Sequence, residues 1–173
     1  MISQTAQFMG ATADRLYSAY LSSADHARMT VDGSLSATFH RPREGDVATG
    51  REGDELRAFG APGLDGQLHY SLHAKVLQLV ANRLIVLTWK NKVWDLALNP
   101  DDVTDLPSTV VLTFANNFAG AEIRLSQVNV PHYAVKVPDT GEVGPLSEIV
   151  NTHWNMLYWE PMKRYFQPAH AHA

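Results

Sequence analysis

The sequence predicts an α+β fold in which about six to seven antiparallel strands form one sheet, two short helices follow the first strand, and a long helix ends the chain. Three patterns indicate this class. Apolar and polar residues alternate along 34–40 and 68–80, as in half-buried strands. Residues 84–89 form an almost continuous apolar run, as in a covered strand. Apolar residues between 146 and 165 recur at steps of three and four, which is the period of an amphipathic helix.

The N-terminal segment predicts a strand and then two helices. Residues 2–9 have the mixed polarity of a short strand. Thr12 is a suitable N-cap for a helix over residues 13–21, because its hydroxyl can accept a hydrogen bond from a free N–H of the first turn. Ser22 offers a second N-cap, so we expect another short helix over residues 24–29.

The following segment predicts two strands separated by a loop. Residues 34–40 alternate and are interpreted as a half-buried strand. Residues 41–53 are charged, contain several glycines and show no period, which favours a long mobile loop, with an interaction loop as the alternative. Residues 55–59 predict a short strand, and the glycine-rich segment 60–66 predicts a turn.

Two hairpins are expected in the middle of the chain. Residues 68–80 and 84–90 form the first, joined where Asn82 can adopt a positive φ. The apolar run in its second strand predicts that this strand is covered on both faces or borders a cavity. Residues 109–114 and 122–130 form the second hairpin.

The C-terminal helix is the clearest predicted element. Gly144 and Pro145 mark its start, because proline is favoured at the first helical position. Pro161 lies inside the helix and cannot donate a backbone hydrogen bond to Leu157, so we expect a kink or a loosening there. The apolar stripe that must be buried comprises Leu146, Ile149, Val150, His153, Trp154, Leu157, Tyr158, Pro161, Met162 and Tyr165.

The composition excludes several partners and cofactors. There are 18 Asp and Glu against 14 Lys and Arg, interspersed, so no basic surface for nucleic acid is expected. The absence of cysteine excludes disulfides, thiolate metal sites and cysteine nucleophiles. No apolar run suggests membrane insertion, and the N-terminus lacks the features of a secretion signal. We expect one cytoplasmic domain over residues 1–168, a flexible tail at 169–173, and no cofactor.

Several local strings resemble a known family. Together with the order of the elements, they are similar to the START-like (SRPBCC) superfamily, and within it to the bacterial single-domain homologues of the activator of heat-shock protein 90 ATPase. The resemblance spans nearly the whole chain and implies a helix-grip fold, in which a curved sheet wraps around the C-terminal helix and encloses an apolar cavity. The strings are 16–21, 23–27 with Thr30, 77–80 leading to 85–90, 125–131 and 154–166.

The chain departs from the family pattern in ways that bear on the cavity. Ala81 and Asn82 replace a Pro-Gly pair, and Leu87 stands where a polar residue is common. The segments 41–53, 99–106 and 133–143 are longer than is usual in the family. Loops of this kind shape a cavity entrance, so the resemblance does not identify the ligand.

The resemblance places aromatic and amide side chains around the cavity as candidate ligand-binding residues. Tryptophan and tyrosine give a large apolar wall with one polar group that orients a ligand. Core packing is the alternative for each of them, because a domain of this size needs such a core. Trp94 and Trp159 are expected either to face outward or to line the entrance. The candidates are Phe59, Leu87, Trp89, Gln127, Trp154 and Tyr158.

The sequence offers little for catalysis or metal binding. None of the common hydrolase, phosphate-binding or dinucleotide-binding strings occurs, so no catalytic residue is assigned. His69 and His73 are about 13 Å apart on a strand, so no metal site is expected. His26, next to Asp25, is interpreted as part of a helix cap. His153 is the residue to test first for catalysis, although a buried core histidine is favoured there.

Three functions are therefore compared. The leading hypothesis is a domain that binds a small apolar or amphipathic ligand between the sheet and the C-terminal helix. The resemblance alone implies the second, a co-chaperone-like domain whose partner is the 90-kDa heat-shock protein and whose effect is to stimulate its ATPase. Fold-level analogy gives the third, a cyclase or aromatase-type enzyme. A filled space between Leu87, Trp89, Trp154 and Tyr158 would argue against a simple carrier.

Overall fold

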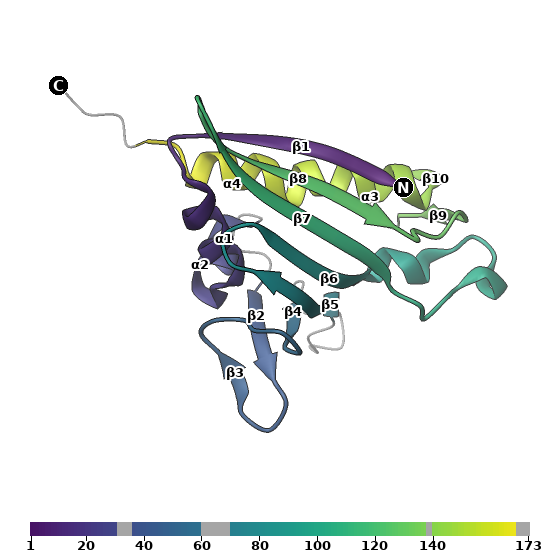
Figure 1. Cartoon of the computed structure of the whole chain (residues 1–173). Helices are drawn as coiled ribbons and strands as arrows, with labels where there is room; N and C mark the ends of the chain where they lie inside the picture. Colours follow the sequence, from purple (N-terminus) through teal and green to yellow (C-terminus); the bar gives the residue numbers. More distant parts are fainter. Residues whose placement is uncertain (31–35, 60–69, 138–139, 169–173) are drawn as a thin grey trace.

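The structure is a computed structural model that describes residues 1–30, 36–59, 70–137 and 140–168 (Figure 1). The strands are β1 (Ile2–Met9), β2 (Ser36–Arg41), β3 (Gly45–Val47), β4 (Glu55–Phe59), β5 (Tyr70–Val80), β6 (Leu84–Asn91), β7 (Ser108–Asn117), β8 (Gly120–Val128), β9 (Ala134–Lys136) and β10 (Val143–Pro145). The helices are α1 (Ala13–Leu21), α2 (Ser23–Met29), α3 (Leu146–His153) and α4 (Glu160–Tyr165). Shorter helical segments are η1 (Lys92–Leu96), η2 (Pro100–Asp102) and η3 (Trp154–Trp159).

One antiparallel sheet organises the fold. Its eight strands follow the order β1-β8-β7-β6-β5-β4-β2-β3. Strands β9 and β10 pair with each other in a separate two-stranded sheet. The main sheet has more strands than the sequence predicted, because β3 lies inside the segment that was expected to be a loop.

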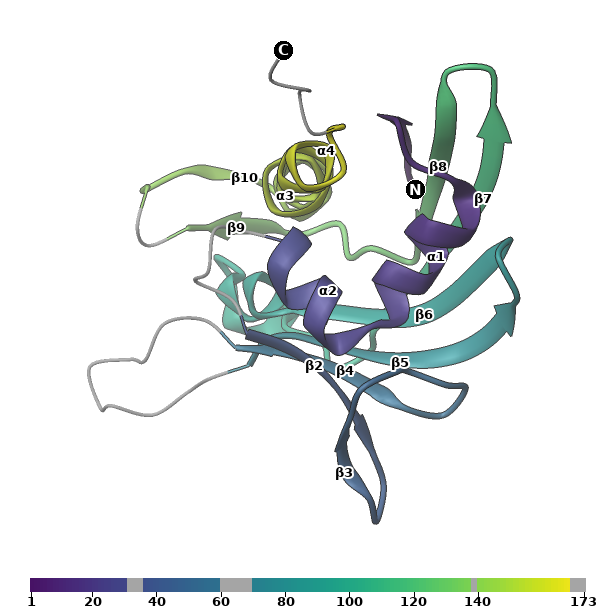
Figure 2. The ribbon, with the colours of Figure 1, turned by 90° about the vertical axis from the view of Figure 1, so that its left-hand side faces the viewer.

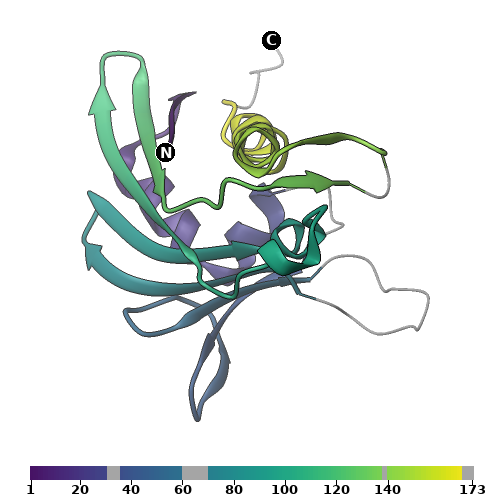
Figure 3. The same ribbon diagram turned by 90° about the vertical axis from the view of Figure 1, so that its right-hand side faces the viewer.

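The sheet is curved and the helices lie on its concave side. Figures 2 and 3 look along the C-terminal helix and show the sheet curving around it. Helix α1 contacts β7 and β8, and α2 contacts β2 and the C-terminal α4. The predicted helix-grip arrangement, with two short helices after the first strand, is confirmed.

Strand β6 is fully buried on one face only. Ile85, Leu87 and Trp89 point into the core, whereas the residues between them are half-buried. The helices of the described chain lie on the concave side, and the outer face of the sheet is left to solvent (Figure 2). Of the two expectations for this apolar strand, the one that it is covered on both faces was therefore wrong, and only its inward-facing residues belong to the core.

Residues 41–47 close the hairpin of β2 and β3, and the rest of the segment 41–53 is tied to the body of the domain. Strand β3 pairs with β2, and Arg43 has the positive φ of 72° that the turn between them requires. Outside the hairpin, the Gly50 N–H donates to the Leu21 carbonyl at 2.8 Å. The Arg41 guanidinium donates two hydrogen bonds of 2.9 Å to the buried carboxylate of Asp54. The prediction of a plain mobile loop was wrong, because periodicity does not report pairing in so short a strand.

Two other long segments also contain local structure. Residues 92–106 include η1 and η2, and Asn99 caps η2 by accepting from the Asp101 N–H at 3.3 Å. Strands β9 and β10 form a small two-stranded sheet, and β10 leads directly into α3. Both segments lie at the end of the molecule where α3 begins (Figure 1). The glycine-rich turn at 60–66 and the tail at 169–173 lie outside the described residues.

Asn82 has the expected left-handed conformation, with a φ of 62°, in the turn between β5 and β6. Replacing Asn82 with alanine should lower the free energy of unfolding by about 1 kcal/mol, because a Cβ-bearing residue without a polar side chain is strained in this region. Replacing it with glycine should leave stability within about 0.5 kcal/mol of the original. Urea unfolding of both variants measures the difference. Equal stabilities for the alanine and glycine variants would contradict this account of the turn.

The two N-terminal helices begin where expected, but with different caps. The Ser22 hydroxyl accepts from the Asp25 N–H at 3.2 Å, which confirms the predicted cap of α2. Thr12 occupies the N-cap position of α1, yet its side chain makes no capping bond. Asn116 of β7 takes that role, since its Oδ1 accepts from the Ala13 N–H at 2.7 Å.

The C-terminal helix is loosened just before Pro161. Its middle part, η3, is π-helical, and the Glu160 N–H donates to the carbonyl of Asn155, five residues earlier. Pro161 has no N–H to donate and its ring crowds the Leu157 carbonyl, so a wider turn at this point relieves the clash. The predicted loosening is confirmed. Pro145 was expected at the first helical position but stands at the N-cap, where its extended backbone still belongs to β10.

Candidate functional site

Three tryptophans form a stacked column between the C-terminal helix and the sheet. The ring centroids of Trp89 and Trp154 are 4.7 Å apart, and those of Trp154 and Trp159 are 5.3 Å apart. Tyr158 lies beside them, with its centroid 4.8 Å from that of Trp154. Phe8 meets Trp159 edge-on. The rings of Trp89, Trp154 and Tyr158 therefore fill the space between them.

A buried chain of hydrogen bonds holds Trp154 in this column. Its indole N–H donates to Gln127 Oε1 at 2.8 Å, and Gln127 Nε2 donates to the Ser108 hydroxyl at 2.8 Å. The Ser108 hydroxyl in turn donates to the Trp89 carbonyl at 2.8 Å. The Gln127 amide therefore holds Trp154 against Trp89, and both of its polar ends are engaged within the protein.

His26 lies at the opposite side of Tyr158 and is fully buried. Its Nδ1 lies 2.7 Å from the Tyr20 carbonyl and its Nε2 lies 2.9 Å from the Tyr158 hydroxyl. The carbonyl can only accept, so Nδ1 carries the proton and the Tyr158 hydroxyl donates to Nε2. Burial lowers the pKa of His26 to about 4 and raises the pKa of Tyr158. Both groups are consequently neutral at pH 7, and together they join α2 to η3.

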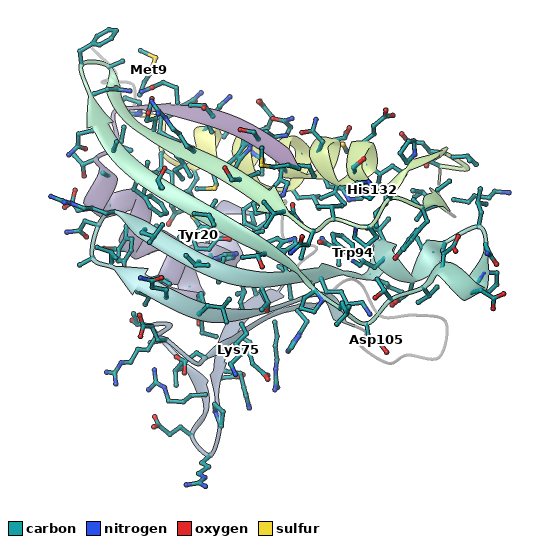
Figure 4. All side chains as sticks on the ribbon, turned by 45° about the vertical axis from the view of Figure 1, so that its right-hand side comes forward. Met9, Tyr20, Lys75, Trp94, Asp105 and His132 are labelled. Atoms are coloured by element: carbon teal, nitrogen blue, oxygen red, sulfur yellow. The ribbon has the colours of Figure 1, made fainter. Side chains whose placement is uncertain are left out.

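The Tyr20 hydroxyl, beside this pair, is buried and has no hydrogen-bond partner among the described residues. Tyr20 is labelled in Figure 4. Its ring stacks on that of Tyr158, with centroids 6.1 Å apart, and meets His26 edge-on at 4.7 Å. Burial raises the pKa of Tyr20 well above its ordinary value. This part of the core is thus packed with aromatic rings and has one unsatisfied polar atom.

A small recess lies at the other side of the tryptophan column, between the end of β6 and the C-terminal helix. It measures about 200 Å³ when the solvent at its mouth is included, and its interior has about 10 Å³ of space for water, which is room for one molecule. Its walls are mostly aromatic and apolar. The lining residues are Trp89, Asn91, Val150, His153, Trp154, Leu157 and Tyr158.

Three polar side chains of the recess have no hydrogen-bond partner among the described residues. Asn91 Oδ1 is buried and unpaired. His153 is half-buried, and burial lowers the pKa of its imidazole. The Trp89 indole N–H, unlike those of Trp154 and Trp159, donates to no described residue. Because buried polar atoms are nearly always paired in folded proteins, an unpaired amide in a recess marks a place where another molecule can bind.

The structure brings together only part of the predicted site. Trp89, Trp154 and Tyr158 line the recess, whereas Leu87 and Gln127 are completely buried in the core. Phe59 belongs to β4, but its side chain lies outside the described residues. No observation tests ligand binding by these residues, so that assignment stays a prediction.

Sequence reasoning missed Asn91 and His26. Asn91 follows Trp89 by two positions in β6, so the alternation of strand side chains already placed it on the inner face. His26 was interpreted as part of a helix cap, but its ring is buried in the core. Its burial follows from the packing of α2 against β2 and α4, which no local pattern reports.

Trp94 and Trp159 are both buried, at 0% and 1% exposure, so the expectation that they face outward or line an entrance was wrong. Trp159 is drawn inward by the wide π-helical turn, and its N–H donates to Gln4 Oε1 at 2.6 Å. Trp94 lies where β6 passes into η1 (Figure 4), and the Tyr133 hydroxyl donates to its carbonyl at 2.6 Å. Both residues serve the core.

Metal binding finds no support in the part of the chain that the structure describes, since no group of three or more His, Asp or Glu side chains gathers there. His73 is half-exposed on β5, 3.5 Å from the Glu55 carboxylate. His69 lies outside the described residues. No helix among the described residues is long and apolar enough to cross a membrane.

Comparison with known proteins identifies the family. The model of the family described as Activator of Hsp90 ATPase homolog 1-like protein matches residues 10–167. The chain belongs to this family. A search of curated proteins finds no significant match to this chain.

Several solved structures share the fold of this chain at low sequence identity. A protein from Chromobacterium violaceum has a TM-score of 0.63 and 16% identity, over 97% of this chain and 98% of that one. An HSP90 activator from Plasmodium falciparum has a TM-score of 0.60 and 17% identity, over 95% and 96% of the two chains. A protein from Mycobacterium smegmatis has a TM-score of 0.60 and 16% identity, over 97% and 91%.

Proposed function

We propose that this domain binds a small apolar or amphipathic molecule in the recess between the end of β6 and the C-terminal helix. The unpaired Asn91 oxygen at an aromatic-walled recess is the observation that supports this most directly. Ligand sites in proteins are commonly apolar clefts with a few polar groups that fix orientation, and this recess has that composition. The loosened π-helical turn forms part of its wall, and such turns occur often at functional sites.

The proposal differs from a carrier with a large preformed cavity. Drug-sized ligands occupy sites of about 300 to 1,000 Å³, far more than the interior of this recess offers. A ligand must therefore displace a side chain of the helix as it enters. Leu157 is suited to this movement because it is half-buried, lies in the π-helical segment and lines the recess.

Titration of the labelled protein with fatty acids, flavonoid-like aromatics and polyketides, followed by NMR, tests this function. We expect the largest shifts at Trp89, Asn91 and Trp154. Replacing Leu157 with tryptophan should block the recess and abolish the shifts. Replacing the exposed Met156 with tryptophan is the matched control and should preserve them. The absence of shifts at β6 and the C-terminal helix with every compound would refute the proposal.

A co-chaperone role is the second candidate, and the family membership and the structural likeness to an HSP90 activator favour it. The segment after β6 offers a contact surface, since Leu98 and Leu106 are 54% and 76% exposed. Exposed apolar side chains that gather on one segment are a frequent feature of protein-binding surfaces. A chaperone of the heat-shock protein 90 class is the partner to test.

The test is binding and ATPase stimulation with the purified chaperone. Replacing Leu98 and Leu106 together with serine should weaken binding if this segment makes the contact. Replacing Leu77, an exposed residue on the outer face of β5, is the control. Failure to bind or to stimulate the ATPase would remove this candidate without affecting the proposal of a ligand site.

Catalysis receives less support from the site. His26 and Tyr158 form a buried ionisable pair, but burial moves their pKa values away from neutrality in opposite directions. Acid–base catalysis at neutral pH is most effective with pKa values near 7. His153 has neither a charged nor a hydrogen-bonded partner that would prepare it as a base among the residues that line the recess. We therefore rank ligand binding above a cyclase or aromatase activity.

A further inference from the structure

We propose that the recess selects a neutral, planar aromatic molecule that carries a hydrogen-bond donor, such as a phenol, and that Asn91 receives this donor. The inference rests on the proposed ligand-binding function and narrows its substrate class. Three features of the recess carry it, namely the absence of charged residues from its lining, the unpaired amide oxygen and the aromatic walls.

The lining of the recess excludes a buried charge on the ligand. None of its seven residues is Asp, Glu, Lys or Arg. His153 is the one titratable imidazole there, and burial lowers its pKa, so it is neutral at pH 7. The Glu142 carboxylate raises the pKa of His153, but this effect is smaller than the lowering by burial. A carboxylate or ammonium held inside would lose its hydration without gaining a counter-charge.

A charged alternative exists outside the recess and has to be tested. Asn91 also borders a second cleft of about 150 Å³, which is otherwise lined by His73, Lys90, Lys92 and Asp95. The Lys90 ammonium is already paired with the carboxylates of Asp95 and Asp105, at 3.3 and 3.1 Å. An anionic aromatic compound therefore belongs among the probes, because binding through this cleft predicts a preference for it.

The unpaired oxygen specifies a donor on the ligand. Asn91 Oδ1 is buried, and no described residue donates to it. An unpaired buried acceptor costs about 1 to 3 kcal/mol, and a ligand hydroxyl or N–H that reaches it recovers part of this cost. An apolar ligand, or one that offers only an acceptor, leaves the oxygen unpaired. The site therefore discriminates by hydrogen bonding more than by size.

The walls favour an aromatic ring. Trp89, Trp154 and Tyr158 line the recess, and because Trp154 is already stacked against both Trp89 and Trp159, a ligand meets the edge of its ring. Aromatic rings gain stability from stacked or edge-on contact with such walls. The interior is small, so a single ring that displaces Leu157 is the largest group that this geometry favours.

Four single-ring probes test the class directly: p-cresol carries a donor, 4-methylanisole only an acceptor, toluene neither, and 4-methylbenzoate a negative charge. Dissociation constants are measured at pH 7 by tryptophan fluorescence and by NMR shifts at Trp89 and Trp154. We expect p-cresol to bind about ten-fold more tightly than toluene or 4-methylanisole, which is the effect of one hydrogen bond. Binding of 4-methylbenzoate should be weaker than that of toluene.

In the variant Asn91→Leu, p-cresol and toluene should bind with about equal dissociation constants, and toluene should still bind. Replacing the exposed Asn155 of η3 with leucine is the matched control and should keep the preference. Equal binding of p-cresol and toluene by the original protein, or tighter binding of 4-methylbenzoate, would overturn the inference but leave the ligand site in place. Binding of none of the four, together with no shifts from the larger compounds, would instead refute the proposed function.

Discussion

Replacing Trp154 with alanine should lower the free energy of unfolding by about 3 to 5 kcal/mol, the range found when a large buried aromatic side chain is removed. Trp154 is 2% exposed and stacks on both Trp89 and Trp159. Its loss also leaves Gln127 Oε1 without the donor that it has at 2.8 Å. The cavity and the unpaired Gln127 oxygen both lower the free energy of unfolding. Urea unfolding with two-state analysis measures the change.

A double-mutant cycle with Gln127 separates the two contributions. Replacing Gln127 with leucine alone should cost about 1 to 3 kcal/mol, because the Trp154 N–H is then buried and unpaired. The double variant should be more stable than the sum of the single changes predicts, since the two residues share one hydrogen bond. Replacing the exposed Met156 with alanine is the control for truncation on the same helix. Additive effects would show that the hydrogen bond does not couple the two residues.

Acidification from pH 7 to pH 4 should lower the stability of the domain by about 3 kcal/mol through His26 alone. Its pKa is about 4 in the folded protein, against an ordinary value of 6.5. The unfolded chain therefore binds more protons than the folded chain in this interval, and stability rises with pH. The contribution is fully present above pH 6.5 and is lost as pH falls toward 4. Urea unfolding at several pH values measures the slope.

The variant His26→Gln isolates this contribution. It should be less stable than the original at pH 7, because the hydrogen bonds to Tyr20 and Tyr158 are disturbed, and its stability should depend less on pH between 6.5 and 4. Acidic groups such as Asp25 and Asp54, whose pKa values are lowered, act in both proteins and cancel in the comparison. Replacing the exposed His132 with glutamine is the control (Figure 4). An unchanged slope in His26→Gln would contradict the assignment.

Much of the fold was predictable because the signals are local. The alternation in β5 and β8, the left-handed turn at Asn82 and the apolar stripe of the C-terminal helix each follow from a few neighbouring residues. Short elements escaped prediction. Strand β3, strand β9 and strand β10 have only three residues each, which is too few for a period to be recognised.

The candidate site was predictable only in part. The aromatic residues Trp89, Trp154 and Tyr158 stood out by type and spacing, and they do meet in the structure. Whether they enclose a cavity or fill it depends on how their rings stack, and no sequence pattern contains that information. The expected open space became a packed column beside a small recess.

The sequence by itself determined the antiparallel strands, the Ser22 cap of α2 and the loosened turn before Pro161, because each depends on intrinsic preferences of adjacent residues. Only the tertiary structure decided that His26 meets Tyr158, that Gln127 is used within the core, and that Asn91 is left unpaired. These contacts join segments far apart in the chain, and their energies depend on burial and on distances of a few ångströms. Burial and these distances are defined only in the folded protein, in which the sheet curves around the C-terminal helix.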